Sequence, residues 1–221
     1  MIKKIKHLSI VTLTIIAIAA PVNALAETEK PIRASQIFGY YQKYLDLPPN
    51  LRDGFRLFYK VSSRAPGPIP QLNIINGTQR TRLNTNAHGI ITNMPDSATI
   101  RNGIIEMPTP RPPKGSFSLG LDAVPNIPLG QNIAVSNVNN AVTDINHAVR
   151  IAGGPIAALM PKLESVVFKG AANGFIVFAD GRRIALERKH GGLIFSPNKR
   201  EMRGAANLIF SNSPQSVEFA K

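Results

Sequence analysis

The apolar positions between residues 35 and 46 recur with the period of a helix. Starting at Ile37, they fall at i, i+3, i+4, i+7 and i+8. This spacing places them on one face of an amphipathic helix. Pro48 and Pro49 end it, because proline has no N–H to donate and restricts the residue before it. The predicted buried face is Ile37, Tyr40, Tyr41, Tyr44 and Leu45.

The next apolar residues alternate with polar ones, which is typical of strands with one buried face. Every second residue from Phe55 to Val61 is apolar, after a turn at Asp53-Gly54. Residues 71–75 form a second predicted strand, and a polar strand follows. Asn76-Gly77 between them favours a tight hairpin with positive φ at both residues. Residues 117–124 form another predicted strand.

A short pattern after the hairpin resembles a known family. Thr85, Gly89 and Ile91 are spaced as Thr-x-x-x-Gly-x-Ile. Residues 69–95 around them resemble a hairpin of transthyretin-like and carboxypeptidase-regulatory-like β-sandwich modules. The resemblance implies a β-sandwich-like N-terminal half. Such modules are mostly non-catalytic adhesion, carbohydrate-binding or accessory domains, so it favours binding over catalysis.

The second half of the chain changes from a helical to a strand pattern. Residues 136–151 have helical spacing, with Ser136 or Asn137 as the cap and Gly153-Gly154 as the end. Pro155 opens a second short helix, 156–160. Short apolar runs separated by glycine-containing turns then predict a C-terminal antiparallel β-meander. The runs are 166–168, 175–178, 184–186, 193–195 and 208–210.

These elements predict an α+β protein with a β-sandwich-like N-terminal half, then a helical segment and a C-terminal antiparallel β-meander. The predicted regions are 27–133 and 134–221. They form either two domains or one domain with a shared core.

The N-terminus has the organisation of an export signal. Three lysines precede an apolar run over residues 8–20, and Pro21 and Ala24-Leu25-Ala26 follow. A positive start, an apolar helix and a small-x-small site are typical of a secretory signal peptide. The run is shorter than the ~20 residues that span a bilayer. The sequence therefore predicts a cleaved signal peptide over residues 1–26 and a periplasmic or secreted protein, with an uncleaved anchor as the alternative. No later segment is expected to cross a membrane.

Composition narrows the chemistry. The 221 residues include 26 Lys+Arg, 13 Asp+Glu and no cysteine, for a formal net charge of +13. Loss of the three leader lysines leaves a net charge of about +10. Without cysteine there is no disulfide, zinc–thiolate site, iron–sulfur cluster or thiol nucleophile. The positive charge favours an anionic partner.

Basic residues are concentrated between positions 182 and 203, against two acids, Glu187 and Glu201. We expect the meander to gather them at one end of its sheet, where they would bind an anionic envelope polymer. No aromatic residues are interleaved with them, so sequence-specific nucleic-acid binding is not expected. The alternative is a solvated surface that only aids solubility. The predicted anion-binding residues are Arg182, Arg183, Arg188, Lys189, Lys199, Arg200 and Arg203.

Two serine patterns have a limited resemblance to nucleophile motifs. Ser196-Pro-Asn-Lys199 matches the Ser-x-x-Lys of penicillin-binding enzymes, but their other motifs are missing. We instead interpret Ser196 as a helix cap before Pro197. The segment from Gly115 to Gly120 has Ser116 where a nucleophile elbow around Ser118 needs glycine.

The remaining polar residues give no distinctive spacing. Asp96, Glu106 and Asp122 are the candidates for a carboxylate pair of the kind that hydrolyses glycosides. His88, His147 and His190 have no metal-ligand spacing, so no metal or other cofactor is predicted. The three tyrosines of residues 35–46 could form an aromatic platform for glycans, although packing in the core is the favoured interpretation.

Together these patterns favour an exported cell-envelope protein that is a non-catalytic binding or structural module. Its expected partner is an anionic or glycan surface, or another protein. The alternative is a small secreted hydrolase that uses Asp/Glu residues or Ser196. A pocket with facing carboxylates, or with Ser196 hydrogen-bonded to Lys199, would favour the hydrolase; a flat basic face would favour binding.

The signal-peptide interpretation makes a direct prediction. The mature protein should begin at Glu27, because cleavage follows Ala26. Intact-mass analysis of the exported protein measures this. Retention of residues 1–26 in a membrane fraction would contradict it.

Overall fold

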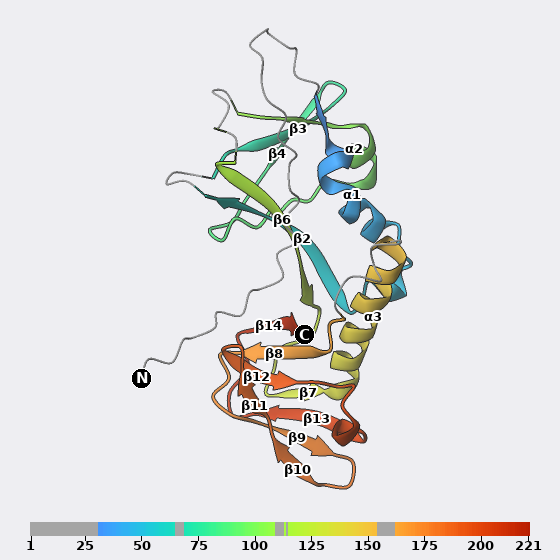
Figure 1. The fold of residues 1–221 in the computed structure, drawn as a ribbon, viewed down its shortest axis with the longest axis vertical. Coiled ribbons are helices and arrows are strands. Elements are labelled where there is room, and N and C mark those ends of the chain that lie inside the picture. The colour runs from blue at the N-terminus through green and yellow to red at the C-terminus, as the bar shows by residue number, and fades with distance from the viewer. Residues whose placement is uncertain (1–30, 65–68, 109–112, 114, 154–161) are drawn as a thin grey trace, which may run out of the picture. The chain divides into compact units, whose positions relative to one another are not determined.

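The computed structural model describes residues 31–64, 69–108, 113, 115–153 and 162–221 (Figure 1). The predicted signal peptide with its Ala26–Glu27 cleavage site and the predicted helix 156–160 lie outside these ranges, as do parts of the proline-rich segments 66–70 and 107–115. The described chain is α+β, and its sheets are antiparallel. The predicted fold class is thereby confirmed.

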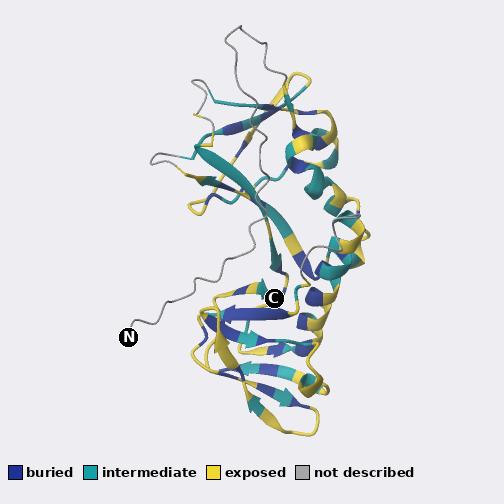
Figure 2. Cartoon of the chain, in the orientation of Figure 1, coloured by how far each residue is buried: buried dark blue, intermediate teal, exposed yellow. Residues whose placement is uncertain are grey.

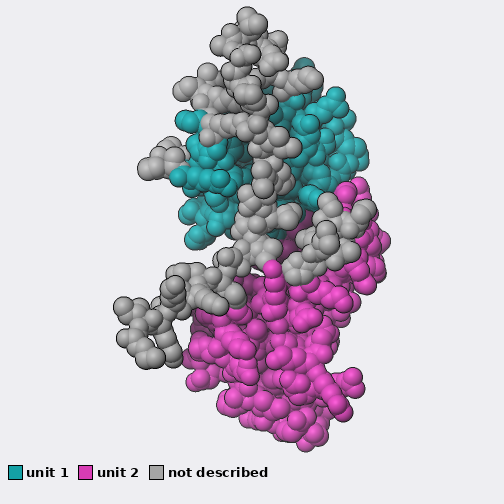
Figure 3. Space-filling view, viewed as in Figure 1, with its two compact units in different colours: residues 1–42, 58–122 teal, residues 43–57, 123–221 magenta. Residues whose placement is uncertain are grey.

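The chain divides into two compact units (Figure 3). Unit 1 contains residues 1–42 and 58–122, and unit 2 contains residues 43–57 and 123–221. The sequence predicted one transition between regions, at residue 133. The structure has three transitions, and it assigns residues 43–57 to the same unit as the C-terminal strands.

Unit 1 is built around a four-stranded sheet in the order β1-β5-β3-β4. Two short helices and a pair of longer strands accompany it, and α2 packs against β1 and β3. The helix α1 and the paired strands β2 and β6 also have residues in unit 2. The elements are β1 (Ile32–Arg33), α1 (Ala34–Leu45), β2 (Phe55–Ser63), β3 (Leu72–Asn76), β4 (Gln79–Leu83), α2 (Ser97–Asn102), β5 (Ile104–Glu106) and β6 (Phe117–Pro125).

The β3–β4 hairpin forms where the sequence predicts it, but its turn differs. Asn76 pairs with Gln79, so the two loop residues are Gly77 and Thr78. Gly77 has a φ of +61°, while Asn76 is the last residue of β3. The prediction of positive φ at both Asn76 and Gly77 is therefore wrong. A positive φ at glycine in the first loop position is typical of a type II′ turn.

The segment around Gly89 adds to β2 rather than forming a regular hairpin. Ile90 pairs with Lys60 in an isolated bridge, and the Val61 N–H donates to the Gly89 carbonyl at 2.8 Å. The Asn86 side chain shapes the preceding loop, because its oxygen accepts from the N–H groups of His88 and Ile90. Side-chain acceptance of this kind stabilises turns locally.

α1 confirms the predicted helix, but its buried face is not the predicted one. Its fully buried residues are Ala34 and Phe38, and the predicted face is only half-buried (Figure 2). Phe38 has φ −100° and ψ 15°, which kinks the helix. The kink shifts the helical phase, so one continuous 3.6-residue period does not describe the whole segment.

Phe38 packs against Tyr59 of β2 in the core of unit 1. Their ring centroids are 4.9 Å apart in an edge-on arrangement. The Tyr59 hydroxyl donates to the Ile37 carbonyl at 2.9 Å, so the buried ring has a partner for its polar end. Burial raises the pKa of Tyr59 well above its usual range.

Unit 2 combines one long helix with two four-stranded sheets. The sheet orders are β10-β9-β13-β7 and β11-β12-β8-β14, and we name them the D sheet and the E sheet. The strands are antiparallel, as predicted, although their order in each sheet is not sequential. The elements are η1 (Pro49–Leu51), β7 (Asn132–Ala134), α3 (Val135–Gly153), β8 (Ser165–Lys169), β9 (Gly174–Phe178), β10 (Arg183–Ala185), β11 (Glu187–Lys189), β12 (Gly192–Phe195), η3 (Arg200–Met202), β13 (Ala205–Phe210) and β14 (Ser216–Ala220).

α3 supplies one wall of both hydrophobic clusters in this unit. Its first half joins the main core with the inner faces of the sheets. Its second half contributes Ile145 and Ala148, which pack with Leu47 and Phe55. The segment that contains Leu47 and Phe55 approaches α3 closely at Gly54. A Cβ there would lie 2.8 Å from the Ala141 Cα, so only glycine fits without displacement.

The core analysis predicts a stability difference within α1. Phe38→Ala should lower the free energy of unfolding by about 3–5 kcal/mol, because it removes a fully buried ring. Tyr41→Ala should cost less, since Tyr41 is only half-buried. Urea denaturation of both variants measures the difference. Equal losses would contradict the assignment of Phe38 as the core residue.

Candidate functional site

Four of the seven predicted anion-binding residues lie at one end of the D sheet. The Phe178 N–H, at the end of β9, donates to the Arg182 carbonyl, and the next N–H, of Ala179, donates to the Gly204 carbonyl. The turn before β10 and the residues before β13 therefore flank the end of β9 from its two sides. We name Arg182, Arg183, Arg200 and Arg203 the arginine cluster.

The members of the arginine cluster are exposed, and only Arg182 has an ion pair within the described residues. The guanidinium of Arg182 lies over the Phe178 ring, 3.8 Å from its centroid, and 3.8 Å from an Asp180 oxygen. Arg183, Arg200 and Arg203 have no ion pair among the described residues. Three guanidinium groups are thus available to an external anion.

Arg188 has a structural contact instead. In the middle of β11, it donates to the carbonyls of Ala171 and Ala172 in the β8–β9 connection. A guanidinium that satisfies two backbone carbonyls stabilises that loop. The structure therefore separates Arg188 from the arginine cluster.

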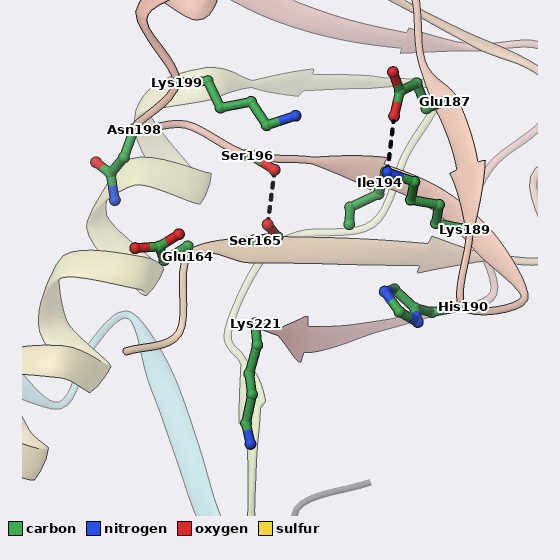
Figure 4. Close-up of a pocket in the computed structure, with 10 residues that line it drawn as sticks. All are labelled: Glu164, Ser165, Glu187, Lys189, His190, Ile194, Ser196, Asn198, Lys199 and Lys221. Carbon is green, nitrogen blue, oxygen red and sulfur yellow. Dashed lines mark hydrogen bonds and ion pairs between the residues drawn. The ribbon is translucent and has the colours of Figure 1, made fainter. Parts of the chain in front are cut away.

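Lys189 and Lys199 line a pocket on the E sheet (Figure 4). Its volume is about 300 Å³, and its walls come from the starts and ends of β8, β11, β12 and β14. The Lys189 ammonium is 3.4 Å from a Glu187 oxygen, so this pair is internally neutralised. Lys199 has no ion pair within the described residues.

A pair of serines lies in this pocket. The Ser165 and Ser196 hydroxyl oxygens are 2.7 Å apart, and Ser165 is 4% exposed. Apart from the Tyr59 hydroxyl, Ser165 is the one buried polar side chain in the described residues. Their position follows from strand alternation: Val166 and Phe168 of β8 and Phe195 of β12 enter the core, so their neighbours Ser165 and Ser196 project to the opposite face.

The prediction that Ser196 caps a helix is wrong. The helical turn that follows, η3, has Lys199 at its cap position with no side-chain cap hydrogen bond. The Ser196 side chain bonds to Ser165, and its carbonyl accepts from the Lys199 N–H at 3.2 Å. Ser196 and Lys199 share the pocket, but the hydrogen bond that would favour a serine–lysine nucleophile is absent between these two described side chains.

The carboxylates proposed for hydrolysis have other contacts. Asp96 caps α2 by accepting from the Thr99 N–H at 2.7 Å, and this hydrogen bond lowers the pKa of Asp96. Glu106 pairs with Arg80 at 2.6 Å and accepts from Asn73 at 2.9 Å. Asp122 lies in β6. The pocket on the E sheet contains two other acids, Glu164 and Glu187, which the sequence analysis did not consider as catalytic carboxylates.

The histidines lie apart. His88 follows Asn86 in the loop beside β2, His147 lies on α3, and His190 is in the β11–β12 turn and lines the pocket. The described residues contain no group of three or more metal-ligating side chains that could hold an ion. In the same residues, no helix has both the length and the apolar character that crossing a membrane requires.

In comparisons with known proteins, no family model, curated protein or solved structure matches the chain. The resemblance of residues 69–95 to transthyretin-like modules therefore stays a prediction.

The separation of Arg188 from the cluster predicts a change in stability without a change in anion binding. Arg188→Ala should lower the free energy of unfolding by about 1.5–3 kcal/mol, because it removes charge-assisted hydrogen bonds. Arg183→Ala is the matched control, and its free energy of unfolding should stay within about 0.5 kcal/mol of the parent value. Thermal and urea unfolding of both variants measures this. An Arg188→Ala protein as stable as the parent would contradict the structural role.

Proposed function

We propose that the protein is an exported, non-catalytic binding module of the cell envelope that attaches to an anionic polymer through the arginine cluster. One observation supports this most: strand pairing brings Arg182 and Arg183 to the same end of the D sheet as Arg200 and Arg203. These two pairs lie in different turns of the sequence, and backbone hydrogen bonds place both turns beside the end of β9.

The chemistry of the cluster suits phosphate or a similar anion. Arginine presents several N–H donors in a fixed plane and can bind an anionic group with two hydrogen bonds at once. Stacking on Phe178 limits the rotamers of Arg182, which lowers the entropy lost on binding. Asp180 and Glu201 lie nearby in the sequence and reduce the local positive charge, so the binding depends on several arginines acting together.

The hydrolase alternative has less support. Ser196 and Lys199 do line one pocket, but the Ser196 hydroxyl is engaged with Ser165. Asp96 and Glu106, two of the three carboxylates first considered, have structural partners in unit 1. Of the two carboxylates in the pocket, Glu187 is paired with Lys189 at 3.4 Å, so a pair of free carboxylates is not formed there by the described residues. A binding role needs only the exposed cations that are present.

Salt dependence tests the proposal. Binding of the full mature chain to long-chain polyphosphate should weaken by roughly 50-fold between about 50 and 200 mM salt, if about four contacts displace counterions. The quadruple variant R182E/R183E/R200E/R203E should lose binding, and the corresponding quadruple lysine variant should retain most of it. Isothermal titration calorimetry at several salt concentrations measures both effects.

A charge-matched control separates the cluster from the overall charge. Four exposed arginines elsewhere, Arg33, Arg56, Arg64 and Arg150, give the same net charge when changed to Glu. This control should keep most of the affinity of the parent. Equal losses in the two quadruple variants would show that net charge, rather than the cluster, is responsible, and would overturn the proposal.

A further inference from the structure

The pocket on the E sheet differs from the arginine cluster in its chemistry. It is a hollow of about 300 Å³, large enough for a small ligand, and its lining includes cations, carboxylates and hydroxyls. From this lining we infer that it binds a small zwitterion, an amino acid or short peptide with a free ammonium group and a free carboxylate.

The mixed charge excludes simpler ligands. An anion alone would meet two glutamates, Glu164 and Glu187. A cation alone would meet three lysines, Lys189, Lys199 and Lys221. A neutral sugar would lack the Phe, Tyr or Trp face on which sugar rings usually stack, because His190 is the only aromatic residue in the lining. A ligand with both charges offsets the desolvation of both kinds of side chain.

Unpaired charges of both signs are available for such a ligand. Lys189 and Glu187 neutralise one another at 3.4 Å. Lys199, Lys221 and Glu164 have no ion pair among the described residues. In Figure 4 the Lys221 side chain extends away from the serine pair, so Lys199 is the cation beside it. In Figure 4, Lys199 lies beside Ser196 and Glu164 lies beside Ser165, so the two charged side chains are on different sides of the serine pair. Lys199 is placed to bind the ligand carboxylate, and Glu164 its ammonium group.

The serine pair gives the centre of the pocket a directional group. When one hydroxyl donates to the other at 2.7 Å, the accepting serine still has its own proton to donate. Ser165 is buried and held by Ser196, so the pair is fixed before a ligand arrives. The remaining O–H can donate to a peptide carbonyl or carboxylate oxygen between the two charged ends of the ligand.

This site is independent of the proposed polymer binding, because it uses none of the four clustered arginines. The experiment uses the ¹⁵N-labelled full mature chain and four probes. Alanyl-alanine has both charges, N-acetyl-alanyl-alanine lacks the ammonium, alanyl-alanine amide lacks the carboxylate, and N-acetyl-alanyl-alanine amide lacks both. Chemical-shift titration should give alanyl-alanine a Kd on the order of 1 mM. Each singly blocked probe should bind about tenfold more weakly.

Variants assign each end of the ligand to one side chain. Lys199→Met should weaken alanyl-alanine about tenfold and leave the amide probe unchanged, since that probe has no carboxylate to lose. Glu164→Gln should also weaken the binding of alanyl-alanine about tenfold. It should leave the affinity for N-acetyl-alanyl-alanine unchanged, because that probe has no ammonium group. Ser196→Ala should weaken every probe, by about fivefold. Arg183→Met, outside the pocket, is the control and should change nothing.

Three results would overturn the inference. They are no binding of alanyl-alanine up to about 20 mM, equal affinity for all four probes, and shifts confined to residues away from β8, β11 and β12. Polyphosphate binding by the same samples reports on the arginine cluster separately. Loss of one activity with retention of the other therefore identifies which of the two assignments has failed.

Discussion

The alternation of side chains along β8 and β12 is the constraint on which the unit 2 surface depends. Val166, Phe168, Leu193 and Phe195 must enter the core together, because the two strands pair and the sheet has one inner face. Ser165, Ile194 and Ser196 are consequently held on the other face. A shift of one residue in register would turn both serines toward the core and the phenylalanines away from it. The register that forms the core therefore also forms the serine pair, and the core stabilises the site at no additional cost.

Much of the fold follows from local patterns. The helical period of α3 and the alternation in β2 each extend over enough residues to identify the element. The glycine-containing turn after β3 identifies the hairpin. The elements that the sequence analysis missed are short or paired over long distances. β1 and β5 have two and three residues, too few for a period, and are fixed by pairing with each other. β14 alternates clearly, with Val217 and Phe219 facing inward, and this signal was available but not used.

The site could be predicted only in part. The charge concentration from residue 182 onward is visible in the sequence, and its two arginine pairs do lie at the same end of the D sheet. Arg188 could not be separated from them, because its partners are backbone carbonyls that carry no sequence signal. Ser196 was noticed through its spacing from Lys199, yet its actual partner lies 31 residues earlier. A serine at the start of the otherwise apolar run Ser165–Phe168 was the one local indication of a polar position opposite the core.

Residues 43–57 have a consequence for the order in which the protein can fold. Leu47 and Phe55 pack with Ile145 and Ala148, and Gly54 abuts Ala141. Roughly 90 residues separate these partners, so closing the loop between them carries a large entropic cost. Synthesis proceeds from the N-terminus, so this segment leaves the ribosome long before α3 exists. Phe55 can contact Tyr44 within this segment, but the contacts with Ile145 and Ala148 form only after α3 has been synthesised. Unit 2 therefore completes its second cluster as a late, non-local step.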